Sequence, residues 1–330
     1  MEENNPNNED FENRVDLKKL SQAVQDIRQA VSQVIVGQQK TVDLLLTAIL
    51  SDGHVLLEGV PGIAKTLTAK LLSRALSVDF SRMQFTPDLM PSDVLGTSVF
   101  NMQRSEFEFK PGPVFSNIVL IDEINRAPAK TQAALFEVME ERQVTLDGHT
   151  HPMRQPYIVM ATQNPIEQEG TYRLPEAQLD RFLFRISMGY PSLAEEKQIL
   201  EYHSQQQARD PLENIKPVLS GEEVLALRHT ISQIRVEKPV LDYMATIVES
   251  TRHDASLYLG ASPRASIALL RGARAYAAMQ GRDFVTPEDV KFLCPVVLGH
   301  RLILTPEREM EGLGVEEVVK QLVGKIEVPR

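Results

Sequence analysis

The sequence has little that would connect it with an oxidising compartment or with a membrane. Cys294 is its one cysteine, so an internal disulfide is excluded, and the neighbouring Leu293 and Val296 favour a buried, small apolar side chain there. No stretch approaches the roughly 18 uninterrupted apolar residues of a membrane-spanning helix, and the N-terminus lacks the basic and then apolar pattern of a signal peptide. We therefore expect a cytoplasmic protein without a membrane span.

Metal-ligand patterns and positive charge are also scarce. Among the seven histidines, His149 and His151 have metal-like spacing, but they follow a predicted Asp147-Gly148 hairpin turn and are more simply explained as solvent-facing. The formal net charge is −10 and the pI is near 5.3, which argues against nucleic acid as a partner because nucleic-acid-binding surfaces are usually basic. A local basic loop stays possible. Five acids through Glu12 predict a disordered acidic leader over residues 1–15.

A glycine-containing segment over residues 59–66, Gly-Val-Pro-Gly-Ile-Ala-Lys-Thr, is the first indication of chemistry. It lies between an apolar run and an amphipathic stretch, where a strand would pass into a helix. Glycines allow backbone N–H groups to surround an anion, Lys65 could reach β- and γ-phosphates, and the Thr66 hydroxyl could bind Mg²⁺. The common pattern has glycine at position 64, and we expect Ala64 to be tolerated if its φ stays negative. The alternative is an ordinary strand-turn-helix corner with a surface lysine.

Two acids follow a second apolar run, Ile118–Ile121, about 55 residues further on. At the carboxyl end of a buried parallel strand, Asp122 would hold the hydration shell of Mg²⁺ and Glu123 would polarise an attacking water. A solvated strand end is the alternative. Both segments together predict hydrolysis of a nucleoside triphosphate, ATP with Mg²⁺. The residues expected to bind it here are Gly59, Val60, Pro61, Gly62, Ile63, Ala64, Lys65, Thr66, Leu67 and Asp122, with Thr66 and Asp122 as the metal ligands.

The order of apolar patterns predicts two domains. Strands and helices alternate over about residues 35–190, which indicates an α/β core with a parallel sheet, and the pattern beyond a hinge at 189–192 is entirely helical. We expect the core over 16–190 and an all-helical lid over 191–330. The predicted strands are His54–Leu57, Arg82–Phe85, Ile118–Ile121, Tyr157–Thr162 and Phe182–Met188. The predicted helices are Lys65–Leu76, Lys130–Arg142, Ala194–Gln206, Gly221–Ile234, Leu241–Thr251, Arg264–Gln280 and Pro287–Val297.

Five motifs resemble those of the AAA+ ATPases with a P-loop NTPase core, and more narrowly the MoxR family. The similarity covers nearly all of the chain after Val36, and alanine at position 64 is usual in MoxR-like sequences. Arg173 stands where the family often has proline, and we attach no functional role to it. The motifs are residues 59–66 and Asp122–Pro128, then Ala161–Pro165, Leu174–Phe182 and Gly260–Ser266.

This resemblance implies further catalytic roles. Asn164 would sense the γ-phosphate or the attacking water, and Arg181 would be the finger that completes a neighbouring subunit's site, with a salt bridge to Asp180 or Glu176 as the alternative. Arg264 would reach the γ-phosphate of its own subunit; on the pattern of charge alone it would be a solvated arginine. Val36 and Gly37 would lie over adenine.

The resemblance also implies a ring, expected to be hexameric, that remodels or matures a client protein complex together with a separate protein that carries a von Willebrand factor A domain. Arg126 and Lys130 would lie near the subunit boundary, and hairpins over Glu106–Phe115 and Val144–Met153 would lie near the pore. The alternatives are a magnesium-chelatase-like ATPase subunit and a DNA-stimulated AAA+ motor. DNA stimulation that falls steeply with salt would indicate the motor.

Overall fold

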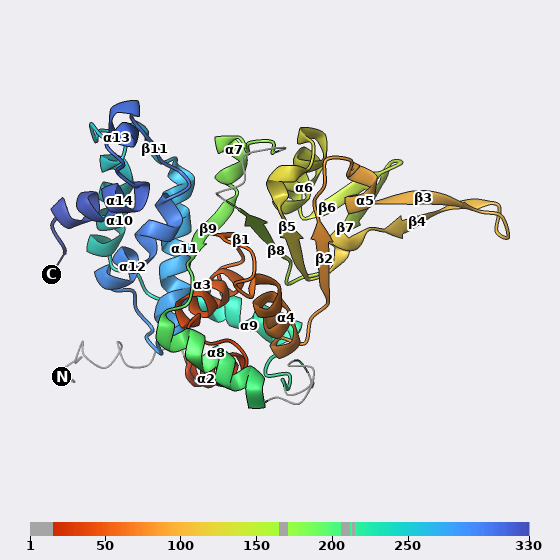
Figure 1. Cartoon of the computed structure of the whole chain (residues 1–330), viewed down its shortest axis with the longest axis horizontal. Coiled ribbons are helices and arrows are strands. Elements are labelled where there is room, and N and C mark those ends of the chain that lie inside the picture. Colours follow the sequence, from red (N-terminus) through yellow and green to blue (C-terminus); the bar gives the residue numbers. More distant parts are fainter. Residues whose placement is uncertain (1–15, 165–170, 206–211, 213–214, 330) are drawn as a thin grey trace, which may run out of the picture.

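The computed structural model describes residues 16–164, 171–205, 212 and 215–329, so the predicted leader over 1–15 lies outside the described residues. Its centre is a five-stranded sheet in which every pairing is parallel, in the order β2-β5-β8-β1-β9 (Figure 1). The strands agree with the predicted ones to within a residue or two: β1 (His54–Gly59), β2 (Phe80–Gln84), β5 (Ile118–Asp122), β8 (Ile158–Gln163) and β9 (Phe182–Met188). The predicted parallel α/β core is confirmed.

Side chains of each central strand alternate between two apolar clusters, one on each face of the sheet. In β1, Val55 and Leu57 belong to one cluster and Leu56 to the other. This is the period of two that an extended strand imposes, and it explains why the central strands are apolar throughout. The first face is covered by α2 (Lys18–Ser32), α3 (Gln39–Leu50) and α4 (Lys65–Ala75). The second is covered by α5 (Pro91–Leu95) and α6 (Ala129–Glu141), with the short turns η1 (Pro113–Phe115) and η2 (Ile124–Arg126).

The chain after β9 is mainly helical, as predicted. Thr286 and Asp289 form a capping box at the start of α12. A ribbon of two very short antiparallel strands, β10 (Leu257–Leu259) and β11 (Ile303–Leu304), was not predicted, because such short strands have no readable period. The helices are α7 (Glu176–Leu179) before β9 and, after it, α8 (Leu193–Gln205), α9 (Gly221–Ser232), α10 (Lys238–Ser250), α11 (Pro263–Met279), α12 (Pro287–Leu298), α13 (Pro306–Met310) and α14 (Val315–Lys325).

One apolar cluster runs from α2 and α3 into these later helices, including α11 and α12. The division of the chain at residues 190 and 191 therefore stays a prediction, since no gap in the core marks it. Cys294 lies inside this cluster, fully buried, and burial raises the pKa of its thiol to about 12. Among the described residues, no helix is long and apolar enough to cross a bilayer.

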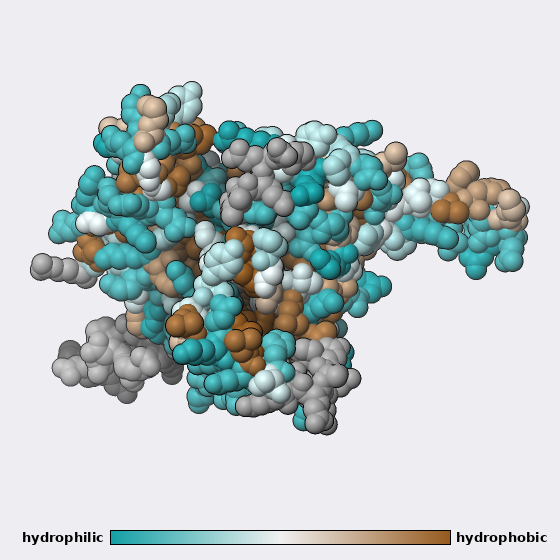
Figure 2. All heavy atoms as spheres, in the orientation of Figure 1, coloured by the Kyte–Doolittle hydropathy of each residue, from teal (hydrophilic) through white to brown (hydrophobic). Residues whose placement is uncertain are grey.

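Two antiparallel hairpins extend from the sheet domain. The longer, β3 (Gly96–Asn101) with β4 (Glu106–Pro111), projects as an arm from the body of the molecule (Figure 1). Apolar residues gather toward its tip in Figure 2, where Phe100, Met102 and Phe107 are exposed. The shorter hairpin, β6 (Gln143–Leu146) with β7 (His149–Pro152), packs against its base. The predicted hairpin over Val144–Met153 is therefore present, whereas the range predicted as Glu106–Phe115 is wrong: it contains β4 and η1, and the partner strand of β4 is the earlier β3.

Candidate functional site

The phosphate loop connects β1 to α4 through two residues in the left-handed region, Gly62 with φ 85° and Ala64 with φ 62°. The expectation that Ala64 keeps a negative φ is therefore wrong. The physical reason is local: the helix begins at Lys65, and the left-handed residue before it turns the chain into the helix axis. A left-handed conformation costs an L-residue other than glycine roughly 1–2 kcal/mol, and it is tolerated where the surrounding structure enforces it.

This loop forms one wall of a cavity of about 410 Å³. Most of the predicted nucleotide-binding and catalytic residues are brought together there. Val60 and Ile63 instead pack against the apolar core. Val36 and Gly37 lie in the turn between α2 and α3, outside this cavity lining, so their contact with adenine stays a prediction. The lining residues are Gly59, Pro61, Gly62, Ala64, Lys65, Thr66, Leu67, Arg82, Gln84, Asp122, Glu123, Thr162 and Asn164.

The Lys65 side chain spans the phosphate loop from its end to its beginning. Its Nζ donates a hydrogen bond to the Gly59 carbonyl at 2.5 Å. Burial lowers the pKa of Lys65, and the nearby carboxylates of Asp122, Glu123 and Glu58 oppose that effect. An anionic phosphate in the loop would likewise oppose the effect of burial and favour the charged form of Lys65. The cavity therefore suits a cationic Lys65 that binds a phosphate.

The two acids after β5 already have partners in this structure. Asp122 accepts from Thr162 Oγ1 at 3.2 Å and from Arg82 Nε at 2.7 Å. Glu123 has a left-handed φ of 56° and accepts from Gln84 Nε2 at 2.8 Å.

Arg126, predicted to lie near a subunit boundary, forms an ion pair with Glu123, with its Nε 2.9 Å from Oε2. A left-handed residue at the end of a strand, enforced by such partners, is typical of a functional site.

Sequence reasoning missed three polar residues of this cavity: Arg82, Gln84 and Thr162. A signal was available, because Gln84 and Thr162 lie at the carboxyl ends of β2 and β8, where side chains meet in a parallel sheet. Arg82 is two residues before Gln84 and therefore on the same face of β2. Alternation along that predicted strand would have placed both of them beside the acids.

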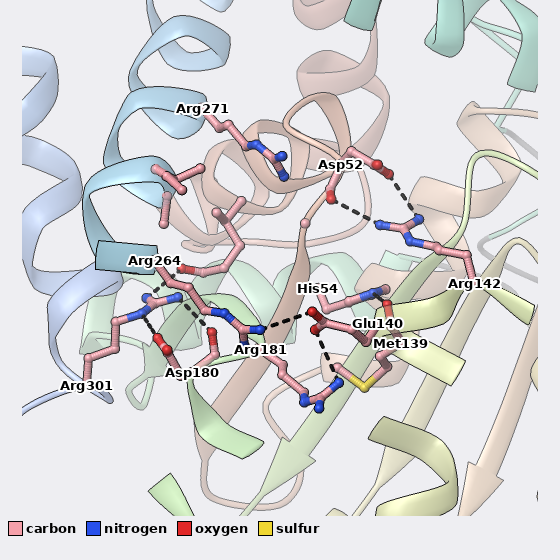
Figure 3. A pocket seen from close by; sticks show the side chains of 14 residues that line it. Asp52, His54, Met139, Glu140, Arg142, Asp180, Arg181, Arg264, Arg271 and Arg301 are labelled. Carbon is pink, nitrogen blue, oxygen red and sulfur yellow. Dashed lines mark hydrogen bonds and ion pairs between the residues drawn. The ribbon is translucent and has the colours of Figure 1, made fainter. Parts of the chain in front are cut away.

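A second cavity, of about 430 Å³, lies at the opposite edge of the sheet, where β1 and β9 begin. Glu140 of α6 binds two arginines there (Figure 3): its Oε2 is 3.2 Å from Arg181 Nη1, and its Oε1 is 3.0 Å from Arg264 Nη2. The alternative partners expected for Arg181 are therefore wrong. Asp180 instead pairs with Arg301 at 2.7 Å, and Glu176 lies 3.6 Å from Arg173.

The placement of Arg264 corrects the expectation that it serves its own subunit. The phosphate loop follows the end of β1, whereas Arg264 lines the cavity near the start of β1. At about 3.3 Å per residue, six residues of strand separate those edges by roughly 17 Å. The Glu140 carboxylate of α6 instead joins Arg264, at the start of α11, to Arg181. Neither the charge pattern nor the motif could indicate this contact.

The surroundings of this arginine pair are positively charged. Five arginines and three acids line the cavity: Arg142, Arg181, Arg264, Arg271 and Arg301 with Asp52, Glu140 and Asp180. His54, at its floor, adds no charge, because burial and nearby arginines lower its pKa to about 3. Its neutral ring is fixed between the Met139 carbonyl at 3.1 Å and the Val159 N–H at 2.9 Å. The excess of guanidinium groups favours an anion as the ligand of this face.

Comparisons with known proteins agree with this geometry. Residues 54–184 match the family model described as "ATPase family associated with various cellular activities (AAA)", and residues 249–322 match the AAA lid domain. The chain is 40% identical to a candidate ATPase of Cytophaga hutchinsonii, whose crystal structure superposes with a TM-score of 0.88 over 95% of this chain and 97% of that one. The class is therefore that of an AAA ATPase with its lid.

Two relatives are similar over most of the chain, and the first carries the family name. The chain is 45% identical to "Chaperone MoxR1" of Mycobacterium tuberculosis, over 91% of this chain and 81% of that protein. It is 48% identical to "Uncharacterized protein YeaC" of Bacillus subtilis, over 91% of this chain and 92% of that protein. The chain belongs to the MoxR family of AAA+ ATPases.

Proposed function

We propose that this protein is an Mg²⁺-dependent ATPase that works as a ring, in which each nucleotide site is completed by Arg181 and Arg264 of the neighbouring subunit. The observation that carries the proposal is the position of two half-sites at opposite edges of one sheet. The phosphate loop occupies one edge, and the arginine pair occupies the other. Since neither half reaches the other within one chain, two chains in contact are needed to bring them together.

The phosphate-loop half has the groups that bind a triphosphate. The first N–H groups of α4 have no side-chain cap, because Ala64 carries no acceptor, and they are available to phosphate oxygens together with Lys65. Thr66 and Asp122 offer a hydroxyl and a carboxylate, oxygen donors that suit Mg²⁺. When bound, Mg²⁺ would supply neutralisation of charge on the phosphates. Arg82 must release Asp122 before both ligands can serve the metal.

Glu123 and Asn164 are the residues proposed to act on the attacking water. Glu123 would accept the water's proton; its contacts with Gln84 and Arg126 are both made by Oε2, so Oε1 is the oxygen we propose for this step. Asn164 follows β8 and lines the same cavity, where its amide could hydrogen-bond the γ-phosphate or the water. The guanidinium groups of a neighbour's Arg181 and Arg264 would stabilise the charge that develops on the transferred phosphoryl group.

We propose chaperone-like remodelling of a client complex as the use of this hydrolysis, supported by the chaperone name of the M. tuberculosis relative. A hexamer and a separate partner with a von Willebrand factor A domain remain part of the proposal. Because Arg264 belongs to α11 in the helical region and would bind a neighbour's γ-phosphate, loss of that phosphate would free the helical region to move relative to the neighbouring subunit.

The experiment that tests the shared site is ATP turnover against protein concentration, with assembly followed by light scattering. We expect the specific activity to rise steeply as the oligomer forms. Arg181→Ala should reduce turnover on the order of 10³-fold, and mixing with Lys65→Ala subunits should restore part of it, because those subunits provide an intact Arg181 to a functional neighbouring site. Concentration-independent turnover by a monomer, or no restoration on mixing, would contradict the proposal.

A further inference from the structure

We propose that Glu140 is a positioning residue that holds Arg181 and Arg264 together, so that both reach the same phosphate of a neighbouring subunit. The inference rests on the proposed shared site and adds a residue to it. Glu140 Oε1 lies 3.0 Å from Arg264 Nη2, and Oε2 lies 3.2 Å from Arg181 Nη1. One carboxylate therefore binds one guanidinium with each oxygen, and Figure 3 shows the two side chains converging on it.

The three residues come from three separate elements of the fold. Glu140 is in the last turn of α6, Arg181 directly precedes β9, and Arg264 is in the first turn of α11. Two guanidinium cations repel each other unless an anion lies between them. Asp180 cannot take that role, because its oxygens bind Arg301 at 2.7 Å and Ser262 at 2.9 Å. Glu140 is thus the carboxylate that sets the spacing of the pair.

Both arginines keep donors for a phosphate while Glu140 holds them. A guanidinium has five N–H groups. Within the described part of the chain, Arg181 uses Nη1 for its contacts with Glu140 and with the Phe136 carbonyl at 2.9 Å, and Arg264 uses Nη2 for Glu140. The Nε and the second Nη of each fork are left for an anion. The carboxylate can therefore orient the pair without blocking it.

The exposure of these side chains indicates that their ion pairs contribute to positioning more than to the stability of the fold. The Glu140 side chain is 42% exposed, Arg181 29% and Arg264 49%. Ion pairs this accessible to water contribute little to folding, so neutralising Glu140 should leave the fold intact. Orientation of a transition-state contact is more sensitive, since a displacement of about 1 Å can cost up to about 100-fold in rate. The effect should therefore appear in turnover and not in melting temperature.

The first test compares Glu140→Gln with Glu141→Gln in the assembled protein. Glu141 is the next residue of α6, is exposed, and carries the same charge, so it is a matched control. We expect Glu140→Gln to lower kcat about tenfold with little change in the KM for ATP, because the amide has one accepting oxygen in place of two and no negative charge to hold the two cations together. Glu141→Gln should match the wild type. Equal kcat in both variants, or a higher kcat in Glu140→Gln, would overturn the positioning role.

The second test is a double-mutant cycle with Arg181→Ala. If Glu140 acts through the arginine pair, Glu140→Gln should have much less effect once Arg181 is absent. Independent, additive losses would overturn the inference. Light scattering and thermal melting check that each variant assembles and folds.

Mixing of variant subunits distinguishes failure of the inference about Glu140 from failure of the proposed shared site. Glu140→Gln subunits should regain turnover with Lys65→Ala subunits, whose arginine pair is correctly held. If Arg181→Ala loses turnover and is restored by mixing while Glu140→Gln behaves as the wild type, the inference alone fails. If Arg181→Ala has normal turnover, the shared site and the inference both fail.

Discussion

Replacing Arg82 by alanine should make the site require less Mg²⁺. In the structure Arg82 Nε binds Asp122 Oδ2 at 2.7 Å and so occupies an oxygen that the proposed metal shell needs. Magnesium must displace this guanidinium, and the energy of the ion pair sets how much that displacement costs. The Asp122 side chain is 12% exposed and the Arg82 side chain 51% exposed, so water screens the pair.

Pairs of this kind contribute up to about 1 kcal/mol, which corresponds to a factor of about five in a binding constant. We expect the Mg²⁺ concentration at half-maximal turnover to fall about two- to fivefold in Arg82→Ala at saturating ATP. Arg82→Lys, which keeps the charge but loses the planar fork, should lie between the variant and the wild type. Titration of free Mg²⁺ against steady-state turnover measures the effect. An unchanged or higher Mg²⁺ requirement in Arg82→Ala would refute the assignment of this arginine as a competitor of the metal.

Two other expectations concern catalysis and stability. Lys65→Ala should lose binding of a fluorescent ATP analogue. Glu123→Gln should bind the analogue normally but hydrolyse ATP about 100-fold more slowly. Equal turnover in Glu123→Gln and wild type would contradict the assignment of Glu123 as the base. The pKa of His54 is about 3 in the fold and about 6.5 unfolded, so its neutral form stabilises the fold fully above pH 6.5, and this contribution is lost as pH falls from 6.5 towards 3. Between pH 7.5 and 5.5, the free energy of unfolding of the wild type should drop more than that of His54→Gln, by on the order of 1 kcal/mol. Urea denaturation at both pH values measures this difference, and equal drops would contradict it.

Local patterns in the sequence were sufficient for the sheet and for the phosphate loop and the two acids of the first cavity. The strands are apolar in both alternating positions because both faces are covered, and Asp122 and Glu123 break that pattern where the chain leaves the sheet. Lys65 and Thr66 follow the loop directly, so their place depends on no distant contact. For such residues, the same short segment of sequence predicts both the chemistry of the side chain and its place in the fold.

The arrangement of the second cavity could not be read in this way. No local pattern distinguishes Glu140 from other charged residues of its helix, and its contact with Arg264 joins residues 124 positions apart. Ala64 shows a different limit. Its small side chain is consistent with a negative φ, but the direction in which α4 leaves the loop requires a left-handed residue there. Long-range packing determines the contact of Glu140, and local backbone geometry determines the φ of Ala64.

The position of the phosphate loop and the arginine pair at opposite edges of the sheet also restricts the symmetry of any working assembly. In a dimer with a two-fold axis the same surface patch of both chains forms the interface, so both sites are completed only if the phosphate loop and the arginine pair share that patch, whereas here they lie at opposite edges of the sheet. A head-to-tail row serves each loop with a different chain, but it ends with a loop at one terminus and an arginine pair at the other. Cyclic closure removes both ends, and it is the arrangement in which every chain gives and receives one pair of arginines.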